Sequence, residues 1–239
     1  MSKTVFISGG SRGIGACAVK EFSKRGYNVA FTYLNSENEA KELSGKTGAL
    51  SIRADASDSK SCKSAIDEAL KVFGKIDVLI NNVGISEFAL FTDTTDEMWH
   101  RMIDTNLSSA FYTTKAVLPQ MISRKDGVII NISSMWGQVG SSCEVHYSVA
   151  KAGLIGLTKA LAKEVGPSNI RVNCVCPGLI ETEMNSHLNE DDIEVIVFDT
   201  PLMRTGKCED VVSTLIFLSE DSSSFITGQI LGVNGGYII

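Results

Sequence analysis

Short apolar runs alternate with helix-like segments along the whole chain of 239 residues. Such alternation is typical of βαβ units, in which parallel strands are covered by helices on both faces of the sheet. We therefore predict an α/β fold, a single doubly wound Rossmann domain over residues 1–239 with seven parallel strands. The predicted strands are Thr4–Ser8, Asn28–Tyr33, Leu50–Arg53, Val78–Asn81, Val128–Ile132, Arg171–Val175 and Gln229–Val233.

The composition fits one well-buried domain and argues against several classes of function. Hydrophobic residues make up 44% of the chain, and no break in composition marks a second domain. A net charge of −6 argues against nucleic acid or an anionic membrane as the main partner. The six cysteines lack metal-type spacing, so no metal site is predicted. Without an apolar run of about 18 residues or a signal-peptide core, we expect a cytoplasmic protein.

A glycine-rich segment, Gly9-Gly10-Ser11-Arg12-Gly13-Ile14-Gly15, follows the first predicted strand and opens a helix. Glycines let the backbone approach a pyrophosphate, and the helix N-terminus supplies N–H groups and positive potential. The spacing differs from the G-x-G-x-x-G fingerprint, and a plain glycine turn is the alternative. The context of strand, glycines and helix predicts a dinucleotide site.

The end of the second strand is expected to contact the adenosine ribose. NAD sites place an acidic residue there, roughly 20 residues beyond the glycines. This chain has Tyr33, Asn35 and Ser36 in that region and no acid before Glu37. Arg12 can pair with a 2′-phosphate, the alternative being a solvated loop arginine. The pattern favours NADP over NAD.

Two further loops follow predicted strands at the edge where open sheets bind ligands. Asp55 and Ala56 follow the third strand, where Asp55 can meet an adenine amino group or, with Ser57 competing, cap a helix. Asn82 and Gly84 close the fourth strand, where a side-chain amide can lock the loop; a tight turn is the alternative.

Tyr147 and Lys151 are four residues apart and so share one face of a helix. An ammonium one turn away favours the phenolate and lowers the pKa of the tyrosine, as general acid–base work requires. Ser134 ends the strand thirteen residues upstream of Tyr147 and can join them. Asn106 lies in an apolar stretch of a helix predicted over 96–121. Buried there, it must be hydrogen-bonded, either satisfying a helix bulge or holding a water.

Two more segments carry predictions about the surface of the molecule. Residues 183–204 have an acidic, amphipathic, helical pattern, which indicates a lid at about 183–205. The helix from Tyr147 is apolar all round and contains Gly153 and Gly156, so we predict a close helix neighbour and a subunit interface there. The apolar tail Tyr237-Ile238-Ile239 also indicates burial against a partner.

Together these motifs resemble the short-chain dehydrogenase/reductase family over the whole chain. By this resemblance, Asn106, Ser134, Tyr147 and Lys151 match the catalytic four, with Tyr147 as the acid and Ser134 holding the substrate oxygen. Lys151 would bind the nicotinamide ribose, and Asn106 would hold a relay water. From the pattern and the resemblance together, the candidate NADP(H)-binding residues are Gly9, Ser11, Arg12, Gly13, Ile14, Gly15, Tyr33, Asn35, Ser36, Asp55, Ala56, Asn82, Gly84, Tyr147, Lys151, Pro177, Gly178, Ile180 and Thr182.

Within the family, the loops resemble those of reductases acting on 3-oxoacyl groups carried by acyl carrier protein, in fatty acid biosynthesis. The resemblance implies such a substrate and a homotetramer. Met203, Thr205 and Cys208 depart from that pattern. An acidic carrier needs a basic dock, which Arg124-Lys125 can supply in part, whereas Ser168-Asn169 offers no second cation. A ketone attached to elongation factor P is the alternative substrate, and a non-enzymatic nucleotide-binding scaffold is the alternative class.

Overall fold

The computed structural model describes residues 2–186 and 188–239, and these form one seven-stranded sheet in the order β3-β2-β1-β4-β5-β6-β7. All neighbouring strands are parallel. The predicted sheet is confirmed, with ends that differ by one or two residues. The strands are β1 (Thr4–Ile7), β2 (Asn28–Tyr33), β3 (Leu50–Arg53), β4 (Val78–Asn81), β5 (Gly127–Ile132), β6 (Ile170–Pro177) and β7 (Ile230–Val233).

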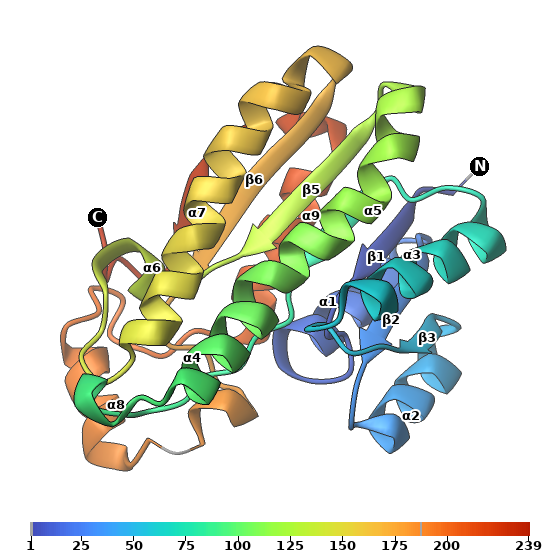
Figure 1. Cartoon of the computed structure of the whole chain (residues 1–239). Coiled ribbons are helices and arrows are strands. Elements are labelled where there is room, and N and C mark those ends of the chain that lie inside the picture. The colour runs from blue at the N-terminus through green and yellow to red at the C-terminus, as the bar shows by residue number, and fades with distance from the viewer. Residues whose placement is uncertain (1, 187) are drawn as a thin grey trace.

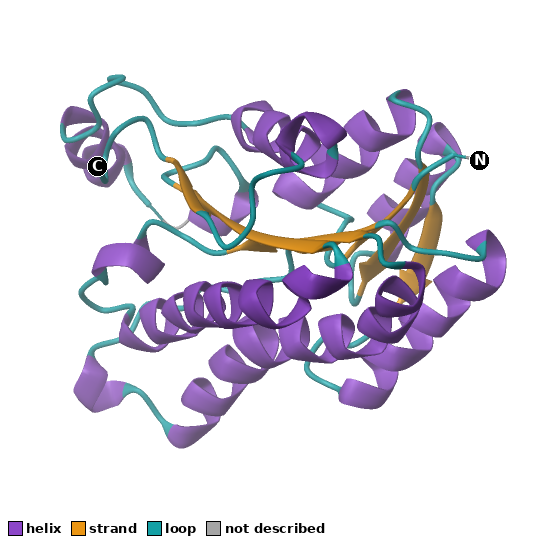
Figure 2. Cartoon of the chain, turned by 90° about the horizontal axis from the view of Figure 1, so that it is seen from above, coloured by secondary structure: helices purple, strands orange, loops and turns teal. Residues whose placement is uncertain are grey.

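Helices cover both faces of the sheet, as Figure 2 shows from above. One layer contains α1 (Gly13–Lys24), α2 (Glu37–Thr47) and α9 (Cys208–Ser219), and the other contains α3 (Ser59–Phe73), α5 (Ser109–Arg124) and α7 (Val145–Val165). The short helices α4 (Asp96–Ile103), α6 (Trp136–Val139) and α8 (Glu190–Phe198) lie near the carboxyl ends of the strands (Figure 1).

The core sits on both sides of the central strands, which explains why their sequences are almost continuously apolar. Val5 and Ile7 of β1 pack with residues of α1 and α9, whereas Phe6 between them packs with residues of α3, α5 and α7. All three side chains have an exposed fraction of 0%. None of the helices in the described residues combines the length and apolar character that crossing a membrane requires.

The helix predicted over 96–121 is confirmed and contains a bulge. Between α4 and α5 the chain forms a π turn, Asp104–Ser108, with Asn106 at its centre. The Asn106 side-chain amide donates to the Met102 carbonyl oxygen at 3.1 Å. The helix-bulge interpretation of Asn106 is therefore confirmed as well.

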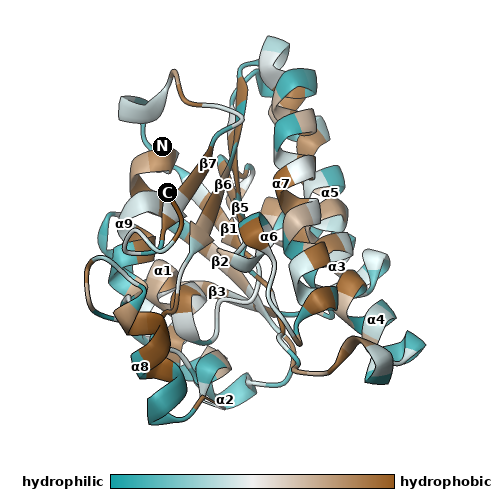
Figure 3. Cartoon of the chain, turned by 90° about the vertical axis from the view of Figure 1, so that its left-hand side faces the viewer, coloured by the Kyte–Doolittle hydropathy of each residue, from teal (hydrophilic) through white to brown (hydrophobic). Residues whose placement is uncertain are grey.

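The prediction of a helix over 183–204 is only partly confirmed. The segment forms a 3₁₀ turn (Glu183–Asn185) and, separately, α8. Asn189 caps α8 through a capping box with Asp192, and Pro201 cannot continue a helix beyond its end. Part of α8 has the colour of hydrophobic residues in Figure 3, and its Val195 and Phe198 side chains are exposed. His187, inside the predicted lid, lies outside the described residues.

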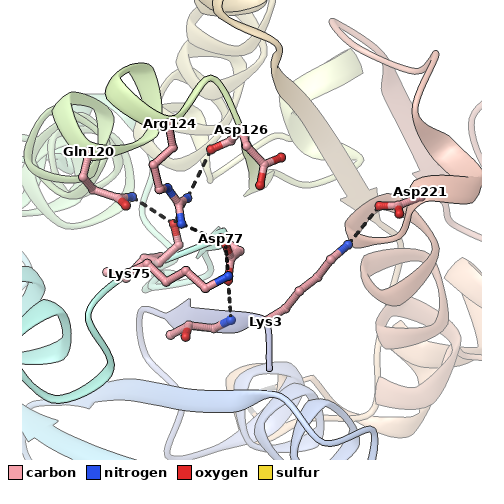
Figure 4. A network of polar contacts seen from close by, with 9 residues as sticks. Lys3, Lys75, Asp77, Gln120, Arg124, Asp126 and Asp221 are labelled. Carbon is pink, nitrogen blue, oxygen red and sulfur yellow. Dashed lines mark hydrogen bonds and ion pairs between the residues drawn. The ribbon is translucent and has the colours of Figure 1, made fainter. Parts of the chain in front are cut away.

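A polar network ties the amino ends of β1, β4 and β5 together (Figure 4). Asp77, just before β4, accepts hydrogen bonds from the Thr4 amide at 2.7 Å and from Arg124 at 2.9 Å. Lys75 lies 3.0 Å from the same carboxylate. Arg124, the first half of the predicted basic dock, is thus held at the edge of the sheet opposite Ser134. That Arg124 contributes to a dock for a substrate carrier stays a prediction, and in this structure its guanidinium is paired with Asp77.

Candidate active site

Ser134, Tyr147 and Lys151 meet at the carboxyl end of β5. Ser134 lies two residues beyond β5, and Tyr147 and Lys151 lie one turn apart near the start of α7. All three are buried, and the Ser134 and Tyr147 hydroxyls are hydrogen-bonded. The Lys151 ammonium lies 5.6 Å from the centroid of the Tyr147 ring and donates to the Ile132 carbonyl oxygen at 3.0 Å. The predicted constellation of hydroxyl, phenol and ammonium is therefore present.

Burial controls the protonation of Tyr147 and Lys151. It raises the pKa of Tyr147 well above the usual value for a phenol; the hydrogen bond from Ser134 offsets part of that, and the charge of Glu144 adds to it. Burial also lowers the pKa of Lys151 to about 8. The prediction that the neighbouring ammonium lowers the pKa of Tyr147 is wrong in this structure, because desolvation outweighs it. Tyr147 consequently holds its proton at neutral pH.

Asn106 joins the site through the loop that follows β4. Its side-chain oxygen accepts from the Ile85 amide at 3.1 Å, and its amide donates to the Ile85 carbonyl oxygen at 3.1 Å. A Cβ on Gly84 would lie 2.8 Å from the Asn106 oxygen and 3.2 Å from the Lys151 ammonium. Only glycine fits there without displacing one of the two side chains. At Gly84 the backbone therefore lies directly beside the catalytic group, with no side chain between them.

The glycine-rich loop between β1 and α1 is closely packed on one side and open on the other. Gly9 and Gly13 have φ angles of +67° and +50°, which favour glycine. A Cβ on Gly15 would lie 2.2 Å from the Gly9 carbonyl oxygen, whereas Gly13 is exposed. The N-cap residue of α1, Arg12, makes no side-chain cap within the described chain, so the first N–H groups of the helix are left for a ligand. This cradle fits the diphosphate of a dinucleotide.

Asn82 locks that loop, as its position predicted. Its side-chain amide donates to the carbonyl oxygens of Gly9 at 2.8 Å and Ser8 at 3.1 Å. Thr32, absent from the predicted site residues, supports the loop from β2 by accepting a hydrogen bond from the Gly9 amide at 3.0 Å. The sequence signal that could have identified Thr32 is a hydroxyl-bearing residue within a mostly apolar strand.

The residues predicted to contact the adenosine lie at the ends of β2 and β3. Tyr33 ends β2 half-buried, Asn35 is exposed, and Ser36 precedes α2. Arg12 in the neighbouring loop is exposed and forms an ion pair with Glu183 at 2.9 Å.

After β3, the Asp55 carboxylate is exposed and accepts hydrogen bonds from the amide and hydroxyl of Ser57, at 2.9 and 2.7 Å. Ala56 beside it is half-buried. The helix-capping alternative for Asp55 or Ser57 is wrong, because Asp58 caps α3 by accepting from the Ser61 amide at 2.8 Å.

The segment after β6 closes the site from the lid side. Pro177 ends β6, and Ile180 forms an isolated parallel bridge with Gly206. Gly178 lies against Asn234, where a Cβ would come within 2.9 Å of the backbone. The Thr182 methyl group would lie 3.4 Å from a Cβ on Gly13, so the residue just before the predicted lid lies beside the glycine-rich loop. The structure thus brings the predicted cofactor and catalytic residues to one edge of the sheet.

Comparisons with known proteins agree along almost the whole chain. A family model described as Enoyl-(Acyl carrier protein) reductase matches residues 9–238. A 3-oxoacyl-[acyl-carrier-protein] reductase of Chlamydia trachomatis is 42% identical, over 99% of this chain and 97% of that relative. The corresponding reductase of Staphylococcus aureus is 38% identical, over 99% and 98%. A solved short-chain dehydrogenase/reductase of Serratia marcescens superposes with a TM-score of 0.92 and 32% identity, over 98% and 97% of the two chains.

Proposed function

Because the chain belongs to the short-chain dehydrogenase/reductase family, we propose that it is an NADPH-dependent reductase of 3-oxoacyl groups carried by acyl carrier protein. Family membership makes it an oxidoreductase that acts on a carbonyl or hydroxyl group with a nicotinamide cofactor. The names of the full-length relatives support the 3-oxoacyl substrate. The observation that carries the proposal is the buried Ser134–Tyr147–Lys151 group beside an open glycine cradle.

In this proposal the ketone oxygen lies between two hydroxyl groups. Ser134 donates a hydrogen bond to that oxygen, and Tyr147 gives it a proton as the alcohol forms. A proton donor must carry its proton at working pH, and the raised pKa of Tyr147 meets this requirement. Burial of both hydroxyls strengthens these hydrogen bonds to the developing negative charge. The bound nicotinamide supplies the hydride.

In this proposal Lys151 and Asn106 act without contacting the substrate. Lys151 holds the nicotinamide ribose, and its positive charge favours the transfer of the proton from Tyr147. Asn106 fixes the loop at Ile85 and, in the proposal, holds the water that returns a proton to the site. The glycine-rich loop and the start of α1 hold the diphosphate. In the proposal, residues 183–205 act as a lid; they follow Thr182, which lies beside Gly13 of the glycine-rich loop.

NADP is preferred to NAD on two grounds. No acidic residue stands between the end of β2 and Glu37, so the carboxylate that NAD sites use for the ribose 2′-hydroxyl is missing from that position. Arg12 is exposed in the adjacent loop and can exchange its partner Glu183 for a 2′-phosphate.

A second substrate is favoured by one specific observation. Arg124 is engaged with Asp77 at the far edge of the sheet, and Ser168-Asn169 offers no cation, so the residues named for a basic dock supply little beyond the charge of Lys125. A ketone borne by another protein, such as elongation factor P, therefore stays the alternative substrate for the same chemistry. The scaffold alternative is set aside because the family assignment and the complete catalytic group both indicate an enzyme.

We also propose that α7 packs against a second copy of the chain. A Cβ on Gly153 would lie 2.7 Å from Leu107, so this glycine already has the predicted helix neighbour within the chain. Gly156 has open space beside it, and Val149 and Phe111 are 43% and 47% exposed. A monomer in light scattering at micromolar concentration would contradict this interface; a dimer or the tetramer that the resemblance implies would agree with it.

The decisive experiment is NADPH oxidation in the presence of an acetoacetyl thioester, with NADH and a Tyr147→Phe variant in parallel. We expect turnover with NADPH, little with NADH, and loss of turnover in Tyr147→Phe with cofactor binding retained. A kcat within about threefold of wild type in Tyr147→Phe would contradict the acid role. If NADPH binds but is not oxidised in the presence of the thioester, the 3-oxoacyl substrate would be contradicted and a protein-borne ketone would be favoured.

A further inference from the structure

The C-terminal tail, residues Asn234–Ile239, folds back onto the loop that carries Ser134. Figure 1 shows the C-terminus beside α6. The Tyr237 ring meets the Trp136 ring edge to face, with centroids 5.6 Å apart and planes at 86°. Such pairs are favourable beyond the area that they bury. Trp136 is the first residue of α6 and stands two residues after Ser134.

Trp136 is connected directly to the catalytic serine. Its backbone amide donates to the Ser134 hydroxyl oxygen at 3.2 Å. A hydroxyl oxygen that accepts from a fixed amide directs its own proton elsewhere, so this contact restricts the orientation of Ser134. The same hydroxyl is hydrogen-bonded to Tyr147. The position of Trp136 therefore helps to set the geometry of both hydroxyl groups.

The tail is rigid enough to hold Trp136 because Asn234 folds it into a compact turn. The Asn234 side-chain oxygen accepts from the Gly236 amide at 3.0 Å, and its side-chain amide donates to the Ile238 carbonyl oxygen at 3.2 Å. The Tyr237 amide donates to the Asn234 carbonyl oxygen at 3.1 Å.

The other side of the tail contacts residues 200–202, which follow α8 within the predicted lid. The Leu202 amide donates to the Gly235 carbonyl oxygen at 3.1 Å. Cβ atoms on Gly235 and Gly236 would lie 2.6 Å from Thr200 and 2.9 Å from Pro201, so this part of the lid packs directly on the tail backbone. One short segment thus touches both the end of the lid and the loop of the catalytic serine.

We propose that Tyr237 is a positioning residue: its ring holds Trp136, and Trp136 in turn fixes the Ser134 hydroxyl. This inference rests on the proposed reductase function and adds to it the role of the tail. Tyr237 contacts Trp136 through its ring and Asn234 through its backbone amide, and neither is among the residues named for the cofactor phosphates. Its removal should therefore act on turnover and leave cofactor binding alone.

The test compares Tyr237→Ala with Tyr237→Phe in the full-length chain. Misplacing a catalytic group by about 1 Å can cost up to about a hundredfold, so we expect kcat of Tyr237→Ala to fall about tenfold, with the NADPH Kd within about twofold. Tyr237→Phe keeps the ring and should restore kcat. Phe225→Ala is the control, since Phe225 is fully exposed at 103%. A Tyr237→Ala kcat within about twofold of wild type, or a loss that Tyr237→Phe does not repair, would overturn the proposal.

Tryptophan emission gives an independent readout. The chain contains two tryptophans, so in a Trp99→Phe background only Trp136 emits. We expect Tyr237→Ala to shift this emission to the red and to increase its quenching by acrylamide; unchanged emission would overturn the contact. If the wild type reduces no ketone, the proposed function fails, and the emission still decides whether Tyr237 holds Trp136. Loss of kcat accompanied by a changed oligomeric state in light scattering would also count against the proposal.

Discussion

Replacing Arg12 with alanine tests how the chain distinguishes NADPH from NADH. A hydrogen bond to a charged group contributes about 1.5–3 kcal/mol. Before it can bind a 2′-phosphate, Arg12 must leave Glu183. That ion pair is worth at most about 1 kcal/mol, because the two side chains are 59% and 72% exposed. The net contribution is then about 1–2 kcal/mol, so Arg12→Ala should weaken NADPH binding about 5- to 30-fold and leave NADH binding almost unchanged.

For Glu183→Gln the structure predicts the opposite effect on NADPH affinity. This change removes the carboxylate that competes for Arg12 and that repels a phosphate. NADPH should then bind up to about fivefold more tightly, again without an effect on NADH. The two variants together separate the phosphate contact from a general effect on the glycine-rich loop.

The assay is a fluorescence titration of each variant with NADPH and with NADH. Arg204→Ala is the matched control, since Arg204 pairs with Asp210 at 2.7 Å and is similarly exposed at 49%. An equal loss of affinity for both cofactors in Arg12→Ala would refute the pairing with the 2′-phosphate. Weaker NADPH binding by Glu183→Gln would refute the competition.

Three further predictions concern stability, pH and the glycine-rich loop. Asp77→Ala leaves Arg124 without its partner and, because Arg124 is still 27% exposed to water, should cost about 2–4 kcal/mol and lower the Tm by about 4–10 °C in a thermal melt. Burial depresses the pKa of Lys151 to about 8 from its usual 10.5, so the native state binds fewer protons between these values. The unfolding free energy relative to Lys151→Met should therefore rise from pH 8 to 10.5 in denaturant titrations, and a flat difference would contradict the depressed pKa. Gly15→Ala should weaken cofactor binding more than about tenfold, because its Cβ meets backbone at 2.2 Å, whereas Gly45→Ala has open space and should bind normally in the same titration.

The sheet could be predicted because buried parallel strands leave a strong local signal. Strands such as β4 and β5 are buried along their whole length and appear in the sequence as apolar runs with a single asparagine in each. The positions of Ser134, Asn82 and Pro177 followed from the same signal, since each comes at or just after the end of a predicted strand. Their convergence is a property of parallel topology rather than of any local motif.

What the sequence did not reveal are features that depend on distant contacts. The bulge at Asn106 was one of two interpretations, but its contact with Ile85, a residue of another segment, could not be predicted from a single polar residue. The pKa of Tyr147 follows from burial by the whole fold, which the spacing to Lys151 does not measure.

The π turn Asp104–Ser108 also sets the rotation of α5 about its own axis. It holds one residue more than a regular helical path needs, and each residue turns a regular helix by about 100°. The wider turn absorbs that extra residue. If the same sequence were wound as a regular helix through this point, α5 would be rotated by about that angle, and Val117 and Met121, now fully buried against the sheet, would swing toward water. The bulge therefore keeps the apolar face of α5 directed at the sheet.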